Sequence, residues 1–168
     1  MPKVFLALGS NLGNRKQNLE KALNYIAEKV TIDMLSPVYE SDPIGYTEQP
    51  LFLNAVLGGT TVLKPLELLK FSKDIEQKMG RQPGFPNGPR TLDIDILFYD
   101  AKMINKPELT IPHPRLTTRA FVLVPLAELA PELVHPGNNR TVKTLLQGLG
   151  KIDGLHRWCE AEEIWQRS

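Results

Sequence analysis

Residues 88–96 have the sequence GPRTLDIDI, and this stretch is the most informative part of the chain. A glycine-proline turn leads to Arg90, after which apolar and acidic residues alternate. In a β-strand alternate side chains share one face and lie about 6.6 Å apart, so Asp93 and Asp95 point the same way while their apolar neighbours face a core. Paired carboxylates beside an arginine suit Mg²⁺ and a polyphosphate, because Mg²⁺ takes hard oxygen ligands and shares them with substrate phosphates. The stretch therefore predicts a strand and chemistry on a nucleotide.

A plainer interpretation of the same stretch has to be set beside this one. Alternating aspartate and isoleucine is also typical of any half-buried edge strand whose acids are simply solvated. For an isolated D-x-D pair this interpretation is favoured. The surroundings of Asp93 and Asp95 must decide between the two.

The length and charge of the chain restrict its class. A chain of 168 residues predicts one domain, 1–168, with its own hydrophobic core. Its formal net charge of +1 creates no field that would attract nucleic acid or an anionic membrane, and no apolar run approaches the ~20 residues of a membrane span. Cys159 is the single cysteine, so no internal disulfide is expected. We expect a cytoplasmic monomer that binds neither nucleic acid nor membranes.

The first half of the chain shows the periodicity of strands around one helix. The apolar run at 3–8 predicts a buried strand that ends in a glycine-containing turn. Asn14 is placed to cap a helix, whose apolar stripe recurs at helical spacing from Leu19 to Val30. Further segments expected are a strand over 31–39, a loop over 41–50, and a strand over 52–62 with a bulge or bend at Gly58-Gly59.

The second half begins with another helix. Pro65 suits the first helical position, and the buried side is marked by Leu68, Phe71, Ile75 and Met79. Residues 80–89 hold three glycines and three prolines and predict a long loop before a strand over 92–99. Beyond it, Thr117 is expected to cap a short helix that Pro125 limits, and a helical stripe is expected at Trp158, Ala161 and Trp165.

The order of these elements indicates the fold. Strand, helix, strand, strand, helix and strand follow one another over residues 3–99. This order favours an α+β, ferredoxin-like core with a mainly antiparallel sheet and helices on one face. Additional C-terminal helices would cover part of the rest.

Several side chains outside the acidic strand suit a phosphate or a flat ligand. Arg81 and Arg90 bracket the glycine- and proline-rich loop, and guanidinium groups match phosphate oxygens, so a lid over a phosphate site is plausible. His113 could add donors with Arg119, although a lone histidine is more often structural. Asn54 must satisfy a donor and an acceptor within a strand and could contact the edge of a flat heterocycle; Phe52 and Phe121, taken alone, are most simply core residues.

The turn at 9–14 is a weak candidate for phosphate binding. It lies between a strand and a helix, but it lacks the Lys-Ser/Thr pair of a P-loop, and its glycine spacing is not that of a dinucleotide site. A plain connecting turn is favoured. A glycine-serine turn with D-x-D also suggests polymerase-β-type nucleotidyltransferases, but two strands and a second helix intervene here, which counts against that comparison.

Together these segments resemble the 6-hydroxymethyl-7,8-dihydropterin pyrophosphokinase family of folate biosynthesis. The resemblance runs in family order from residue 4 to about residue 135. The matching motifs are LGSNLG at 8–13, QP at 49–50, FLNA at 52–55, IE at 75–76, GR at 80–81, GPRTLDIDI at 88–96, PH at 112–113 and RAF at 119–121.

The resemblance implies a function and a set of roles. The activity would be transfer of pyrophosphate from ATP to the hydroxymethyl group of the pterin, which releases AMP. Asp93 and Asp95 would hold two Mg²⁺ ions, and Arg81 and Arg90 would neutralise phosphate charge as the loop closes. The ATP side would comprise Glu76, Ile96, Thr110, His113 and Arg119 together with the two loop arginines, and the pterin side Phe52, Asn54, Phe121 and the backbone of Ser41, Asp42, Pro43 and Ile44.

The chain departs from the family pattern at three positions. Pro83 and Pro114 stand where some members carry arginine and tyrosine, and Asn87 stands where an aromatic residue is expected. These departures concern the contacts of the loop rather than the reaction. Because no aldolase or synthase domain fits in this length, a monofunctional enzyme is expected. Two rival hypotheses stay open: another Mg²⁺-dependent transferase acting on a different hydroxyl, and a non-catalytic nucleotide-binding module.

Overall fold

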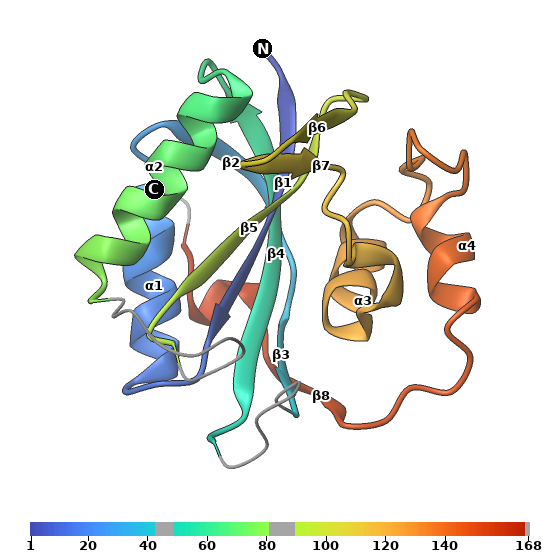
Figure 1. Ribbon diagram of the computed structural model, residues 1–168. Helices are drawn as coiled ribbons and strands as arrows, with labels where there is room; N and C mark the ends of the chain where they lie inside the picture. The colour runs from blue at the N-terminus through green and yellow to red at the C-terminus, as the bar shows by residue number, and fades with distance from the viewer. Residues whose placement is uncertain (43–48, 81–89, 167–168) are drawn as a thin grey trace.

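The computed structural model describes residues 1–42, 49–80 and 90–166. Its centre is a six-stranded antiparallel sheet in the order β5-β1-β4-β3-β8, with β2 also paired to β4 (Figure 1). The strands are β1 (Lys3–Ser10), β2 (Val30–Leu35), β3 (Val38–Ser41), β4 (Phe52–Thr61), β5 (Asp93–Tyr99) and β8 (Leu155–Cys159); β6 (Ile104–Lys106) and β7 (Leu109–Ile111) form a separate hairpin. The core strand order is that of a ferredoxin-like sheet, as predicted.

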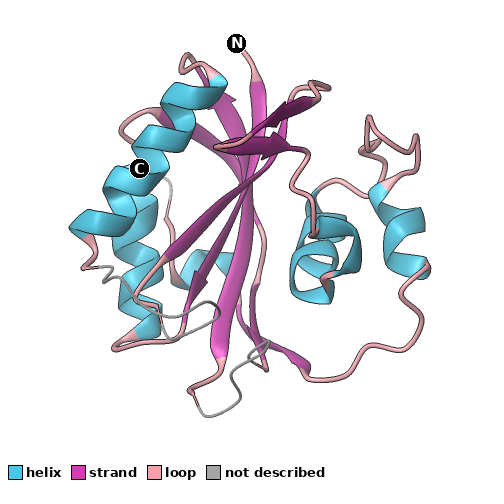
Figure 2. Ribbon diagram, in the orientation of Figure 1, coloured by secondary structure: helices cyan, strands magenta, loops and turns pink. Residues whose placement is uncertain are grey.

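Helices cover both faces of this sheet (Figures 1 and 2). On one face lie α1 (Arg15–Ile26) and α2 (Pro65–Lys78), and on the other lie α3 (Ala120–Leu129) and α4 (Val142–Gln147). Each face has its own hydrophobic core: Leu6 and Leu8 of β1 pack toward α1 and α2, whereas Phe5 packs toward α3. Because both faces are buried, β1 shows an apolar run instead of a clean alternation.

The predicted helix starts agree with the structure. The Asn14 side chain accepts a hydrogen bond from the Gln17 backbone N–H at 3.0 Å and caps α1, and Pro65 occupies the first position of α2. The apolar stripe extends further than the helix, since α1 ends at Ile26 and Val30 already belongs to β2.

The strand expected over 31–39 is broken into β2 and β3, which lie end to end along the same edge of β4. Pro37 has no N–H to donate, and the ladder is bridged at Ser36, whose backbone N–H donates to Val56 O while its Oγ accepts from Val56 N, both at 2.9 Å. The expected irregularity at Gly58-Gly59 is confirmed, because the register of β2 shifts opposite these residues and a side chain at Gly59 would collide with the Thr31 carbonyl.

Three expectations for the C-terminal part are wrong. Pro125 lies inside α3 and does not limit it, since Pro125 and three neighbours are buried and this packing outweighs the lost hydrogen bond. Thr117 lies in the 3₁₀ turn η1 (Leu116–Thr118), and Arg119 holds the cap position. Trp158 belongs to β8 rather than a helix, because the open edge of β3 offers backbone partners to the tail; only the 3₁₀ turn η2 (Ala161–Glu163) follows.

None of the helices in the described parts of the chain combines the length and the apolar character that crossing a membrane requires.

Candidate functional site

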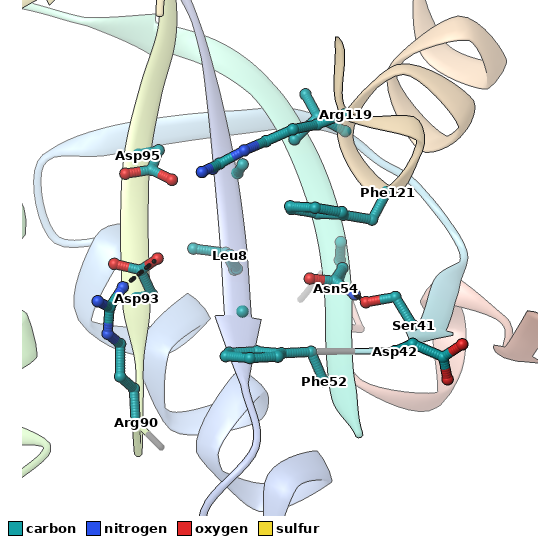
Figure 3. Close-up of a pocket in the computed structure, with 14 residues that line it drawn as sticks. Leu8, Ser41, Asp42, Phe52, Asn54, Arg90, Asp93, Asp95, Arg119 and Phe121 are labelled. Atoms are coloured by element: carbon teal, nitrogen blue, oxygen red, sulfur yellow. Dashed lines mark hydrogen bonds and ion pairs between the residues drawn. The ribbon is translucent and has the colours of Figure 1, made fainter. Parts of the chain in front are cut away.

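The acidic strand alternates as the sequence predicts. Ile94 is buried in the core beneath α1 and α2, whereas Asp93 and Asp95 keep about a quarter to a third of their side-chain surface exposed. Since neighbouring positions of a strand face opposite sides, both carboxylates lie on the α3 side of the sheet, facing Arg119 across β1 (Figure 3). A cleft on this side has two adjoining compartments, and both are lined by Arg90, Asp93, Asp95 and Arg119.

The first compartment is a narrow apolar slot with one amide at its back. Figure 3 shows the rings of Phe52 and Phe121 one above the other, with Asn54 between them. Phe52 and Asn54 come from β4, and Phe121 comes from the first turn of α3. Asn54 is buried, and its Nδ2 donates to the Oγ of Ser41 at 2.6 Å, which orients the amide. The slot suits a flat molecule with hydrogen-bonding groups at its rim.

The second compartment is polar and extends from the acidic strand toward α2 and β7. Its lining residues are Leu69, Lys73, Glu76, Ile94, Ile96, Pro107, Glu108, Leu109, Thr110, His113, Pro114 and Arg115, besides the four residues that it shares with the slot. At its junction with the slot the guanidinium groups of Arg90 and Arg119 lie near the two aspartates, and a phosphate chain would find donors there.

The charged form of Asp95 is disfavoured by its surroundings. Burial, together with the charge of Asp93, raises the pKa of Asp95 to about 7, although Arg119 and Arg90 oppose this shift. Arg90 Nη1 lies 3.3 Å from Asp93 Oδ2. In the described residues no group of three or more His, Cys, Asp or Glu side chains could enclose a metal ion. Two carboxylates nevertheless fit Mg²⁺, which usually binds one or two protein carboxylates and completes its shell with water and phosphate oxygens.

Glu76 supports the acidic strand from the opposite side. Its side chain is buried at the end of α2, and Oε2 accepts a hydrogen bond of 2.8 Å from the backbone N–H of Ile94, between the two aspartates. This charge-assisted hydrogen bond fixes the position of β5 relative to α2. Glu76 thus borders the second compartment and also positions Asp93 and Asp95.

His113 is a neutral donor next to the acids. Burial first, and then the charges of Arg119 and Arg115, lower the pKa of His113 to about 4. Nδ1 accepts from the Arg115 backbone N–H at 3.2 Å, so the ring proton is on Nε2, which lies 3.8 Å from Asp95 Oδ1. A neutral imidazole N–H directed at the junction can donate to an anionic oxygen without changing its charge.

The turn at 9–14 ties other segments together; Gly9 lines the slot, and no residue of the turn lines the second compartment. Asn11 is fully buried; its Oδ1 accepts from the Arg90 backbone N–H at 2.7 Å, and its Nδ2 donates to Gln49 Oε1 at 2.7 Å and to Pro50 O at 3.1 Å. Asn18 in turn donates to Ser10 Oγ and to Leu12 O. The preference for a connecting turn over a phosphate loop agrees with these bonds.

The predicted site residues come together from segments far apart in the chain. The slot is lined by Ser41, Asp42, Phe52, Asn54 and Phe121, the second compartment by Glu76, Ile96, Thr110 and His113, and the junction by Arg90, Asp93, Asp95 and Arg119. Phe52 and Phe121, which alone indicated a core, line the slot instead. Arg81, Pro43 and Ile44, together with Pro83 and Asn87, lie outside the described residues.

The sequence interpretation missed two cations of the second compartment. Lys73 precedes Glu76 by three residues on α2, a spacing that places both on one helix face, so it could have been found from Glu76. Arg115 follows His113 by two residues, and its charge lowers the pKa of both His113 and Arg119. Gly9 of β1, another lining residue, gave no signal beyond its place in the turn motif.

Comparison with known proteins identifies the family. The family model for 7,8-dihydro-6-hydroxymethylpterin-pyrophosphokinase matches residues 5–131. The chain belongs to this family. A 2-amino-4-hydroxy-6-hydroxymethyldihydropteridine pyrophosphokinase of Aquifex aeolicus is 42% identical, over 85% of this chain and 89% of that protein. The same enzyme of Pseudomonas aeruginosa is 38% identical, over 90% and 98%. The resemblance seen in the sequence is thereby confirmed.

Other relatives of the family are longer. A mitochondrial folate synthesis bifunctional protein of Arabidopsis thaliana is 48% identical over 99% of this chain, which spans 33% of its length, and the chain spans 23% of a folic acid synthesis protein of Dictyostelium discoideum. Among solved structures, wild-type HPPK-DHPS of Plasmodium falciparum superposes with a TM-score of 0.70 at 19% identity, over 88% of this chain and 44% of that one. This similarity confirms the α+β fold.

Proposed function

We propose that this chain transfers the pyrophosphoryl group of ATP to the hydroxymethyl oxygen of 6-hydroxymethyl-7,8-dihydropterin at the junction of the two compartments. The observation that carries the proposal is that a flat, amide-containing slot and a charged compartment share the same acidic pair as their common wall. A bisubstrate transfer requires this geometry, since the two substrates must meet end to end where charge is neutralised.

The slot would hold the pterin. Phe52 and Phe121 would stack on its two faces, and Asn54 would hydrogen-bond its edge, with backbone groups of Ser41, Asp42, Pro43 and Ile44 completing the rim. The pterin's hydroxymethyl group would then point toward Asp93 and Asp95. Stacking between two aromatic side chains orients a flat ring without demanding charge, so it selects a heterocycle by shape and edge groups.

The second compartment would hold ATP. Asp93 and Asp95 would bind two Mg²⁺ ions, which when bound neutralise the phosphate oxygens. Arg90, Arg119 and the neutral Nε2–H of His113 would donate to the phosphates, and Glu76, Ile96 and Thr110 would border the nucleotide. In the reaction a bond forms from the hydroxymethyl oxygen to the β-phosphorus while the bond from that phosphorus to the AMP oxygen breaks, and the hydroxymethyl proton is released to solvent. Positioning and charge neutralisation suffice, and no strong base is required.

Some expectations stay predictions. Arg81, outside the described residues, is predicted to neutralise phosphate, so Arg81→Ala should lower turnover more than pterin affinity. The single domain, the cytoplasmic location, the monomeric state and the lack of binding to nucleic acid or membranes also stay predictions, and one Arabidopsis relative carries the word mitochondrial in its name.

One assay tests the proposed function. Protein, ATP, Mg²⁺ and 6-hydroxymethyl-7,8-dihydropterin are incubated together, and AMP and the pterin pyrophosphate are measured. AMP is expected only when both substrates are present. A transferase for another hydroxyl would form no AMP with the pterin, and a non-catalytic module would bind ATP without forming AMP; either result would overturn the proposal.

A further inference from the structure

Arg15 lies outside the two compartments but contacts the segments that carry the slot. It is the first residue of α1, and its side chain is about a quarter exposed. Its Nη1 donates to Glu40 Oε2 at 2.7 Å and to the backbone oxygen of Leu51 at 2.8 Å. The guanidinium group also lies over the ring of Trp158 on β8, 5.8 Å from the ring centre. One side chain therefore joins α1, β3, the start of β4 and β8.

Both partners of Arg15 immediately precede residues of the slot. Glu40 comes before Ser41, which accepts the hydrogen bond from Asn54, and Leu51 comes before Phe52. Ser41 and Phe52 are themselves opposite each other in the β3–β4 ladder. Arg15 thus binds the pair of strands at the end where the slot is built.

The energetics of this end make such a link necessary. β3 has only four residues, and strand ends have few ladder bonds to hold them. A half-buried, charge-assisted bond is stronger than a neutral one, and both partners of the Arg15–Glu40 pair are only 22–24% exposed, so solvent screens them less than a surface pair. Anchoring of the start of β4 would therefore help to hold Phe52 in place opposite Phe121 of α3.

We infer that Arg15 is a positioning residue for the pterin slot, which acts through Leu51 and Glu40 on Phe52 and Ser41. The inference rests on the proposed function. It separates Arg15 from the residues that touch substrate, because Arg15 contacts neither compartment and affects pterin only by fixing the wall on which the pterin stacks.

The first test compares Arg15→Ala with a matched arginine. Arg15→Ala is expected to raise the KM for the pterin about tenfold, as expected for a displaced binding wall, while kcat and the KM for ATP change less than about twofold. Arg157→Ala is the control: Arg157 on β8 forms ion pairs with Glu128 and Glu160, and neither partner borders the slot. The control should leave the pterin KM unchanged. An unchanged pterin KM in Arg15→Ala, or an equal rise in the control, would overturn the inference.

A charge exchange separates positioning from simple ion pairing. In the double variant Arg15→Glu/Glu40→Arg the ion pair can re-form, but a glutamate at position 15 cannot donate to Leu51 O. The pterin KM is therefore expected to stay raised even if the melting temperature recovers. Restoration of the pterin KM by the exchange would show that the charge pair alone matters and would overturn the inference.

A milder variant covers the case in which Arg15→Ala does not fold. Arg15→Lys keeps the charge beside Glu40, but its compact ammonium on a flexible four-carbon stem does not reproduce the guanidinium geometry; the pterin KM should rise several-fold, and an unchanged value would contradict the inference. Failure of the proposed function is recognised separately, as an absence of AMP with the unaltered protein. In that case equilibrium titration with the pterin would still compare the affinity of the unaltered protein with that of Arg15→Lys.

Discussion

The two compartments of the cleft share a wall, yet they differ in how complete they are without ligands. In the slot Asn54 is hydrogen-bonded to Ser41, and the rings of Phe52 and Phe121 lie one above the other, with Arg119 Cζ 5.4 Å from the centre of the Phe121 ring. In the charged compartment the Asp95 carboxyl has a pKa raised to about 7 by burial and by Asp93. The slot is organised by packing, whereas the charged compartment contains a repulsion between two carboxylates that a bound cation would relieve.

Because of this difference, we expect the two compartments to respond to different perturbations. A slot made by packing should lose affinity when an aromatic wall is removed, with little dependence on metal or salt. A compartment made of close charges should lose turnover when a charge is removed, and its behaviour should depend on pH and on Mg²⁺. Four predictions test this contrast, ordered from the largest expected effect to the smallest.

Removal of Asp95 should have the largest effect. Asp95→Ala deletes half of the acidic pair and is expected to lower kcat by about a hundredfold to a thousandfold, because loss of one transition-state charge contact costs about 10²–10³. Pterin binding to the nucleotide-free protein, measured by equilibrium titration, should change far less. A turnover rate close to that of the unaltered enzyme would show that the proposed metal site is wrong.

Removal of a slot wall should produce the opposite pattern. Phe121→Ala is expected to weaken pterin binding by about tenfold to a hundredfold, since stacking of one base on an aromatic side chain is worth about 1–3 kcal/mol, while ATP binding changes little. Phe121→Tyr retains the flat ring and is the matched control, expected to bind nearly as well. Equal loss of ATP and pterin affinity in Phe121→Ala would mean that the compartments are not separate.

The missed cation Arg115 should make a smaller contribution. Arg115 borders the charged compartment and is exposed, so its interaction with phosphate is screened by solvent and worth about 0–1 kcal/mol. Arg115→Ala is expected to raise the KM for ATP about two- to fivefold, more at low salt than at high salt. Arg140→Ala, an exposed arginine that lines neither compartment, should have no effect; a similar rise in both variants would point to net charge alone.

The pH dependence of stability should reveal the acidic pair without any substrate. Because the folded protein holds a proton on Asp95 up to about pH 7, while an unfolded aspartate releases it near pH 4, Asp95 makes the metal-free protein less stable as pH rises through this window. Asp95→Asn should remove the penalty and raise the free energy of unfolding by about 1–3 kcal/mol at pH 8, with a smaller gain at pH 5.

Thermal unfolding of both proteins at several pH values measures this difference. His113 acts in the opposite sense, since its pKa is lowered to about 4 and it makes the fold less stable as pH falls below 6.5. Added Mg²⁺ should stabilise the unaltered protein more than Asp95→Asn. A gain for Asp95→Asn that is the same at pH 5 and pH 8 would contradict the raised pKa.

Much of the first hundred residues could be predicted from local signals. The Asn14 cap, the start of α2 at Pro65 and the alternation of β5 each depend on a few neighbouring residues, and each agrees with the structure. The predictions for the C-terminal part were wrong where contacts with residues far away in the sequence determine the secondary structure. Pro125 stays within α3 because the sheet and α4 pack around it, and Trp158 joins a strand because β3 presents an open edge.

The site shows the same division. Its acidic pair, arginines and His113 were visible as motifs because charged residues at fixed spacing are themselves a local pattern. The roles of Phe52 and Phe121 were not, since an aromatic residue in a core and one in a slot have the same local sequence. Lys73 could have been found from its spacing to Glu76, but Arg115 and the anchoring bond of Glu76 to Ile94 emerged only when α2, β5 and the segment after β7 lay side by side.

The amino-acid sequence alone therefore determined the order of the core elements, the shared face of the Asp93 and Asp95 side chains, and the family. The reason is that periodicity, helix caps and motifs depend on residues that are close together in the sequence. Tertiary structure alone decided that one acidic pair serves two compartments, and that Arg15 and Asn11 tie the turn after β1 to the walls of the site. The physical reason is distance along the chain: these contacts join segments whose meeting depends on how both faces of the sheet are packed.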